Sequence, residues 1–205
     1  MMNAPPTIST EGAGGRAEAQ RERILSAAQR CFIEHGFHAA SMADIAVAAQ
    51  MSAGLMYRYF ENKQAIVLAI VERQLEEKRS FIRQLHSAQA FTTGLAEAFK
   101  LWRAGDPRVM SPALYLEMSA EATRNPQIAA ALRRSDALTR AELQAWLASP
   151  RSEGGFGLSQ DVAASRALLL RSIVEGLALR AAREPDLDLA PLRSALEDLF
   201  ARLLA

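Results

Sequence analysis

Residues 41–63 read SMADIAVAAQMSAGLMYRYFENK, and this stretch decides the fold. Its first part predicts a short helix that starts with an S-x-x-D capping box, in which Ser41 and Asp44 satisfy each other's backbone amides. The chain breaks at Gln50 and restarts at Ser52, a second N-cap candidate. A helix as short as the second one is unstable alone and must be held by its neighbours. The stretch therefore predicts a helix-turn-helix whose second helix enters the DNA major groove.

The same residues resemble the DNA-binding region of the tetracycline-repressor (TetR) family. The resemblance covers about residues 18–70. It combines caps, a turn, aromatic side chains and a basic residue at fixed spacing, carried by Ser41, Asp44, Ile45, Ala46, Ala49, Ser52, Tyr57, Phe60 and Lys63. Gln50 departs from the family pattern, because Gly is usual there; a left-handed backbone at Gln50 would cost roughly 1 kcal/mol. Leu55 also departs, and it either touches a thymine methyl or packs inward.

The motif supplies a set of candidate DNA contacts. They are the two caps, the second helix and the residues that flank it: Ser41, Met42, Ser52, Ala53, Gly54, Leu55, Tyr57, Arg58, Tyr59 and Lys63. A lysine is unfavourable at a helix N-terminus unless an anion is near, so we expect Lys63 to hold a phosphate, as we expect of Tyr59. For Tyr57 a core position is the alternative, because tyrosine often buries its ring and leaves the hydroxyl exposed.

Net charge does not point to DNA. Residues 1–63 contain six basic and six acidic residues, so the expected DNA-binding part is neutral overall. Phosphate binding then depends on where the charges lie and not on their sum. The basic residues that flank the motif are Arg21, Arg23, Arg58 and Lys63.

Composition predicts an all-α fold. The chain has 205 residues, of which 50% are hydrophobic, and it is rich in helix formers and poor in β-branched residues. The single Cys31 excludes an internal disulfide framework. No apolar run is long enough to span a membrane, and the N-terminus does not read as a signal peptide. We therefore expect a soluble cytoplasmic protein with no membrane partner.

We expect about nine helices in two domains. Residues 1–17 should be a disordered arm, residues 18–62 the three-helix DNA-binding domain, and residues 63–205 a larger ligand-binding and dimerisation domain. Outside the motif, the sequence predicts seven helices. Three cover about 18–35, 63–85 and 91–104; the fourth runs from Asp106-Pro107 to about 125 and the fifth from there to about 149; the last two cover about 159–183 and 188–204. The helix at 63–85 has a broken apolar stripe of Ile66, Ala69, Ile70, Gln74, Leu75, Phe81 and Ile82. Three glycines make 150–157 a flexible loop.

The last two helices predict a homodimer. Leucines recur at alternating spacings of three and four, as in a coiled-coil seam, at Leu189, Leu192, Leu196, Leu199 and Leu203. We expect 159–183 and 188–204 of two subunits to form a four-helix bundle. The small residues Ser172, Gly176 and Ala181 would allow close approach. A two-fold dimer would present two recognition helices to a palindromic operator.

Large adaptable side chains recur in the second domain. They are Phe99, Trp102, Met110, Tyr115, Met118 and Trp146. Any one of them is more often core, but as a group they can line an apolar pocket, and the resemblance implies that this pocket binds an inducer. His35, His38 and His86 show no metal-ligand spacing, and no catalytic triad, phosphate loop or zinc motif is present. We expect no metal, no cofactor and no enzymatic activity.

The sequence thus predicts a ligand-responsive transcriptional repressor that binds double-stranded DNA as a homodimer and is released by a small, largely apolar effector. One alternative is a helical small-molecule-binding protein or enzyme in which the N-terminal helices serve only for packing. Another is an architectural or activating DNA-binding factor without a ligand.

Overall fold

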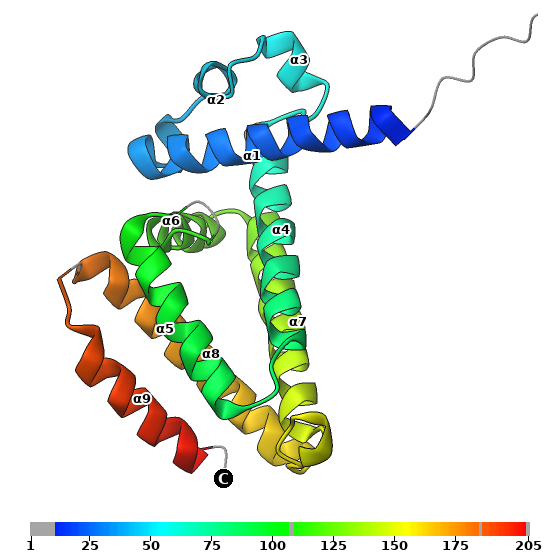
Figure 1. The fold of residues 1–205 in the computed structure, drawn as a ribbon. Coiled ribbons are helices and arrows are strands. Elements are labelled where there is room, and N and C mark those ends of the chain that lie inside the picture. Colours follow the sequence, from blue (N-terminus) through cyan, green and yellow to red (C-terminus); the bar gives the residue numbers. More distant parts are fainter. Residues whose placement is uncertain (1–10, 107–108, 185, 204–205) are drawn as a thin grey trace, which may run out of the picture. The chain divides into compact units, whose positions relative to one another are not determined.

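The computed structural model describes residues 11–106, 109–184 and 186–203, and it confirms the all-α fold class for them. Nine α-helices and one 3₁₀ turn make up the described chain (Figure 1): α1 Glu11–Ala39, α2 Met42–Ala48, α3 Ala53–Tyr57, α4 Lys63–Arg83, α5 Ala88–Ala104, α6 Pro112–Ala122, α7 Pro126–Ala148, η1 Arg151–Glu153, α8 Gln160–Arg183 and α9 Leu189–Leu203. The chain divides into two compact units, one ending at Ile66 and the other beginning at Val67. Helix α4 therefore contributes its first turn to one unit and its remainder to the other.

The first unit is built on α1, against which α2 packs, with α3 in turn against α2. Gly36 interrupts α1 with a φ of 78°, as expected of a helix stop, and the Phe37 ring lies 5.4 Å from that of Phe32. The core is formed by fully or nearly fully buried side chains from every helix of the unit, namely Ile24, Ala28, Cys31, Phe32, Ile45, Met56, Phe60 and Ile66. Burial raises the pKa of the Cys31 thiol, which fits a packing role.

The expected disordered arm ends earlier than predicted. Residues 11–17 are helical, so the first helix begins before residue 18. The run AEAQRER at residues 17–23 consists of strong helix formers, and a helix nucleated there extends toward the N-terminus although Gly12, Gly14 and Gly15 are poor helix formers. Residues 1–10 lie outside the described part of the chain.

In the second unit, α8 packs against α5, α6 and α7, while α9 packs against α5 (Figure 1). These contacts enclose a core of aliphatic and aromatic side chains, among them Phe91, Leu95, Phe99, Leu143, Trp146, Leu147, Leu170, Leu177, Leu196 and Phe200. The Phe91 ring stacks on Trp146 at 5.9 Å and meets Phe200 edge-on at 5.1 Å, so α5, α7 and α9 are joined by aromatic contacts.

Two expected segments of this unit differ from the structure. The helix expected from Asp106-Pro107 begins instead at Pro112, whose missing amide suits the first turn; Pro107 itself is not described. The segment 150–157 is packed, since the Trp146 indole donates to the Gly154 carbonyl at 3.2 Å. A Cβ on the buried Gly155 would lie 2.1 Å from the Ser149 hydroxyl, so this turn depends on glycine.

The leucines of α9 do not form one exposed seam. Leu196 is only 6% exposed and packs into the core of its own unit, whereas Leu199 is 42% exposed. Helix α9 turns its apolar face to α5, which leaves few leucines for another subunit. Ala181 is also buried within the unit. The large apolar side chains exposed on α8 are Val162, Leu168 and Leu169.

Candidate nucleic-acid interface and ligand cavity

Both predicted N-caps of the helix-turn-helix are confirmed. The Ser41 hydroxyl accepts the Asp44 amide hydrogen at 3.1 Å, and the Ser41 amide donates to the Asp44 carboxylate at 2.9 Å. The Ser41 hydroxyl and amide hold the pKa of the Asp44 carboxyl below its usual range. At the next helix the Ser52 hydroxyl accepts the Leu55 amide hydrogen at 3.2 Å. These local bonds fix where α2 and α3 begin.

The turn between α2 and α3 is left-handed at Gln50. Its φ is 52°, the sole positive φ of a non-glycine residue within the described ranges. The guanidinium of Arg23 donates to the Gln50 carbonyl at 2.9 Å and lies 3.5 Å from the side-chain oxygen. Helix α1 thus holds the turn through Arg23 in a backbone region that L-residues other than Asn and Asp avoid.

Replacing Gln50 by Gly is expected to stabilise the first unit by about 0.5–1 kcal/mol, because glycine adopts the left-handed region without strain. The Arg23 bond to the main-chain carbonyl is retained. Urea unfolding followed by circular dichroism measures the change. Gln50→Ala is the control, since it removes the same side chain but keeps the strain; an equal gain for Ala would contradict the backbone explanation.

The outer face of the motif carries most of the predicted DNA-contact residues. Exposed members are Ser41, Ser52, Ala53, Gly54, Tyr57 and Arg58; partly buried members are Met42, Leu55, Tyr59 and Lys63. Tyr57 is 53% exposed, so it is a surface residue and not the core residue that was its alternative. The inward side of α3 is supplied by Met56, followed by Phe60. Val47 on α2 is 77% exposed and was not among the predicted contacts.

Lys63 is engaged within the first unit. Its ammonium donates to the carbonyls of Phe37, His38 and Ala40 at 2.5, 3.1 and 2.9 Å, and it lies 4.6 Å from the centre of the Phe37 ring. Three donors therefore meet three carbonyls at the junction of α1 and α2. This arrangement braces the junction of α1 and α2, and the phosphate contact expected of Lys63 stays a prediction.

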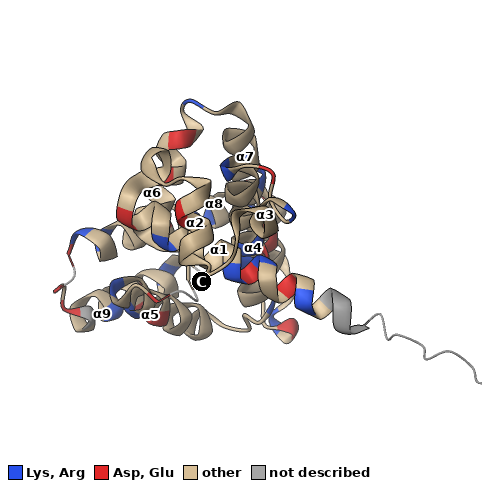
Figure 2. Ribbon diagram, turned by 90° about the horizontal axis from the view of Figure 1, so that it is seen from above, with Lys and Arg blue, Asp and Glu red and all other residues tan. Residues whose placement is uncertain are grey.

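Two other basic residues near the motif also serve its folding. The Arg21 guanidinium lies 4.6 Å over the Phe60 ring and donates to the Tyr59 carbonyl at 3.5 Å. Arg23 holds the turn as described above. Arg58 is different, because it is exposed and forms no hydrogen bond or ion pair with any residue that the structure describes. Figure 2 shows both signs of charge interspersed along the ribbon, so we expect any phosphate contact to depend on single positions such as Arg58.

Arg58→Ala is expected to weaken binding to all DNA sequences alike and to lower the salt slope of binding by about one per subunit. Fluorescence anisotropy with duplex DNA at several salt concentrations measures this effect.

Lys63→Met is expected to lower the free energy of unfolding by about 2 kcal/mol, with the salt slope unchanged, because it removes charge-assisted bonds to carbonyls. Urea unfolding measures the change in stability, and the same anisotropy experiment measures the slope. A Lys63 variant with normal stability and a reduced slope would restore the phosphate role.

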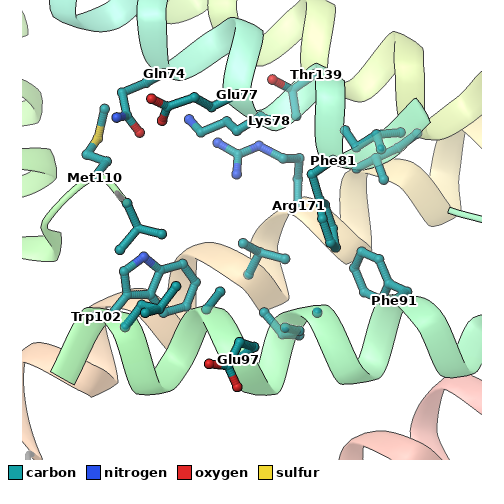
Figure 3. A pocket seen from close by; sticks show the side chains of 18 residues that line it. Gln74, Glu77, Lys78, Phe81, Phe91, Glu97, Trp102, Met110, Thr139 and Arg171 are labelled. Carbon is teal, nitrogen blue, oxygen red and sulfur yellow. The ribbon is translucent and has the colours of Figure 1, made fainter. Parts of the chain in front are cut away.

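The second unit contains a cavity of about 420 Å³ between α4, α5, α7 and α8 (Figure 3). Of the six predicted ligand-binding residues, Trp102 and Met110 line it. Tyr115 lines a smaller neighbouring cavity that shares Met110. The size is within the usual range for small-molecule sites, and most of the wall is apolar.

The other three predicted ligand-binding residues, Phe99, Met118 and Trp146, line none of the cavities described here. Phe99 and Met118 are 1% and 2% exposed, and Trp146 packs against Phe91 and Phe156. Large apolar side chains on the inner face of a helix are more often core, and that is where the structure places these three.

Charged side chains lie at one side of the cavity. The Arg171 guanidinium pairs with Asp136 at 3.1 Å and with Glu175, whose carboxylate also accepts the Tyr115 hydroxyl at 2.9 Å. Burial, reinforced by Glu175, raises the pKa of Tyr115 to about 12, so its hydroxyl stays protonated. Burial, reinforced by Arg171, lowers the pKa of Lys78 to about 8. Sequence reasoning did not assign Lys78 or Arg171 to the cavity.

Two negative observations concern the described residues alone. No helix among them is long and apolar enough to cross a membrane. Nor do they contain a group of three or more His, Cys, Asp or Glu side chains arranged to hold a metal ion.

Comparison with known families gives two matches along the chain. Residues 24–70 match the model described as bacterial regulatory proteins, tetR family. Residues 104–205 match the model described as BetI-type transcriptional repressor, C-terminal. The first match spans the helix-turn-helix, and the second spans α6 to α9.

Individual relatives point the same way. The chain is 36% identical over 125 residues to the HTH-type transcriptional regulator UidR of Escherichia coli K12; the match covers 57% of this chain and 59% of that regulator's length. The fold is similar to that of Salmonella enterica GusR, with a TM-score of 0.72, 29% identity and coverage of 91% and 95% of the two chains. It is also similar to FadR from Bacillus subtilis in complex with stearoyl-CoA, with a TM-score of 0.65, 19% identity and coverage of 87% and 96%.

Proposed function

Since this chain belongs to the tetR family of bacterial regulatory proteins, we propose that it is a transcriptional repressor that binds a palindromic operator as a homodimer. The observation that carries the proposal is the helix-turn-helix of the first unit. Two side-chain caps fix α2 and α3, and the outer face of α3 is left exposed with Arg58 beside it. The match to UidR covers 59% of that protein, so the activity of the whole molecule is part of the proposal.

We assign the division of labour to the two units. The first unit, with α1 to α3, binds DNA, and the second binds the effector and the other subunit. The dimer contact is proposed on α8, where Val162, Leu168 and Leu169 are exposed and the open Gly176 allows close approach. The exposed Leu199 of α9 extends the same kind of surface.

The effector is proposed to occupy the cavity of the second unit, whose wall is mostly apolar. A neighbour in fold, FadR, is described in complex with stearoyl-CoA, which supports a ligand with a large apolar part. Helix α4 lines this cavity and also begins in the first unit, so a ligand that shifts α4 can change operator affinity. Coupling of this kind is typically about 1–3 kcal/mol, or roughly 5–150-fold in affinity. The protein is thus proposed to act by binding alone, with no catalytic step.

Selection of bound duplexes from a random DNA library tests the DNA-binding proposal. The expected result is a palindrome whose half-site centres lie about one helical turn apart, or a multiple of it. Enrichment of a single unsymmetrical half-site would contradict the dimeric arrangement. Recovery of no sequence above background would leave the helical small-molecule binder as the better reading.

Trp102 is expected to report effector binding. Trp102 lines the cavity, whereas Trp146, the other tryptophan of the chain, is core, so a Trp146→Phe variant leaves one indole whose fluorescence should change on binding. Trp102→Ala is expected to weaken the release of operator by the effector about tenfold, as a lost aromatic contact of 1–3 kcal/mol implies, with operator affinity in the absence of effector nearly unchanged. Loss of DNA binding or of folding without a selective effect on release would mean that Trp102 is a packing residue.

A further inference from the structure

One side of the cavity has two polar groups on a single helix. Gln74 and Lys78 both line it, and they lie four residues apart on α4, which places them on the same helix face. Figure 3 shows their nitrogen-bearing ends on the side of the cavity opposite Trp102. A ligand in the cavity would therefore meet an amide donor and an ammonium on the same side of the cavity, where Figure 3 also shows the Glu77 carboxylate.

Gln74 is buried without a hydrogen-bond partner for its amide nitrogen. It is 3% exposed, and its Nε2 contacts no acceptor within the described ranges. Buried polar groups are nearly always hydrogen-bonded, because an unmade bond is costly in an apolar setting. Because Gln74 lines the cavity, its free donor is available to an acceptor on a bound ligand.

Lys78 is partly buried, and in the described part of the chain its ammonium forms no hydrogen bond or ion pair. The nearby carboxylates are engaged elsewhere: Glu77 lies 3.8 Å from Arg73, Glu97 lies 3.1 Å from Lys100, and both Asp136 and Glu175 pair with Arg171. Among the charged residues of the cavity wall, Lys78 is therefore the one that has no oppositely charged side chain in contact with it within the described ranges. Its lowered pKa reflects this desolvation.

Most of the remaining wall is apolar. Its apolar side chains include Phe81, Phe91, Leu95, Leu101, Trp102 and Val109. Such a wall favours a hydrocarbon or aromatic body, and its other charged residues, Glu77, Glu97 and Arg171, are each paired with another side chain.

We propose that this cavity binds an amphipathic carboxylate, whose apolar body fills the wall between α4 and α5 and whose carboxylate oxygens accept from Lys78 Nζ and Gln74 Nε2. The proposal rests on the effector role assigned to this cavity and names the chemical class of the effector. One unpaired cation matches a monoanion, whereas a dianion such as a phosphate monoester would leave a second negative charge uncompensated. Because both donors belong to α4, the carboxylate would bind directly to the helix that continues into the first unit.

Binding of matched pairs of small molecules tests this proposal. The probes are decanoate with decanol, and naphthoate with naphthylmethanol, each titrated into the full-length protein by calorimetry at pH 7. At least one carboxylate is expected to bind tenfold or more tightly than its neutral partner. Lys78→Met should remove that tenfold preference and leave the alcohol bound as before or better. Gln74→Leu should reduce carboxylate affinity several-fold with little effect on the alcohol.

Arg133→Met is the matched control, because Arg133 is an exposed cationic residue on α7 that does not line the cavity. It should leave all four affinities unchanged. Equal binding of acid and alcohol, an equal loss of both in Lys78→Met, or no binding of either carboxylate would overturn the proposal. Thermal melts check that each variant is folded, and Lys78→Met should melt no lower than the parent since it removes an uncompensated charge.

Operator release is measured separately on labelled duplex. A carboxylate that binds in a Lys78-dependent manner but leaves DNA affinity unchanged would support the site and refute its effector role. A protein that binds the carboxylate and no DNA at all would support the site and refute the proposed transcriptional function. Each failure is thus distinguishable from the other.

Discussion

Replacing Leu196 by Glu is expected to unfold the second unit and not merely to separate two subunits. Leu196 is 6% exposed and belongs to the core that α9 forms with Phe91 and Phe200. The substitution removes a buried leucine, at about 2–5 kcal/mol, and places a carboxylate among apolar groups, at several kcal/mol more unless it is protonated. This sum approaches the whole stability of an ordinary domain, about 5–15 kcal/mol.

Urea unfolding of the second unit, followed by circular dichroism, measures the effect. Ala201→Glu is the matched control, since Ala201 is an exposed residue of the same helix and lies outside the proposed interface; it should retain a cooperative transition close to that of the parent. Were Leu196→Glu to remain fully folded and become monomeric, the structure would have misplaced this leucine, and the seam predicted from the sequence would regain support.

Leu169→Glu is expected to convert the proposed homodimer into folded monomers. Leu169 is 45% exposed on α8, so the charge is solvated in a single subunit and its effect on folding should lie within about 0.5 kcal/mol. In a dimer that buries this face, the introduced carboxylate is desolvated and gains no oppositely charged partner, which costs several kcal/mol for each copy. Operator affinity should fall by about a hundredfold or more, because two half-sites are no longer bound by one molecule.

Sedimentation velocity and thermal melts measure association and folding of this variant. Leu116→Glu is the comparison, because Leu116 on α6 is exposed to a similar extent, 41%, and lies outside the proposed interface. A dimer that persists in Leu169→Glu, or a dimer lost equally in Leu116→Glu, would exclude α8 as the specific contact.

The features that the sequence predicts correctly are those set by local chemistry. The caps at Ser41 and Ser52 need only a side chain and an amide three residues away. For Gln50 the sequence indicates only that a left-handed backbone would be strained, and the structure shows that its φ is 52°.

The features that it does not predict depend on which helices meet. The hydrogen bonds from Lys63 to the carbonyls of Phe37, His38 and Ala40 could not be predicted from its position at the start of a helix, because they depend on how α1 and α2 meet. The spacing of the α9 leucines is the same whether they face α5 or a second subunit, so periodicity alone does not decide between these partners.

The residues of the cavity wall illustrate the same limit. Trp102 and Phe99 lie three residues apart on α5, yet one lines the cavity and the other is core. A signal for the polar side of the cavity did exist in the sequence, because Gln74 interrupts the apolar stripe of α4. Its meaning needed the knowledge that no acceptor lies within reach of its amide.

The salt dependence of DNA binding tests the central claim most directly. Equilibrium affinity of the full-length protein is measured by anisotropy for a duplex that carries the selected palindrome and for a shuffled duplex, between low and moderate salt. We expect log affinity to fall linearly with log salt, with a slope of about −4 or steeper for a dimer that makes several phosphate contacts, and tighter binding of the palindrome at every salt concentration. Affinity that is absent, independent of salt, or equal for the two duplexes would contradict the assignment of this chain as an operator-binding regulator.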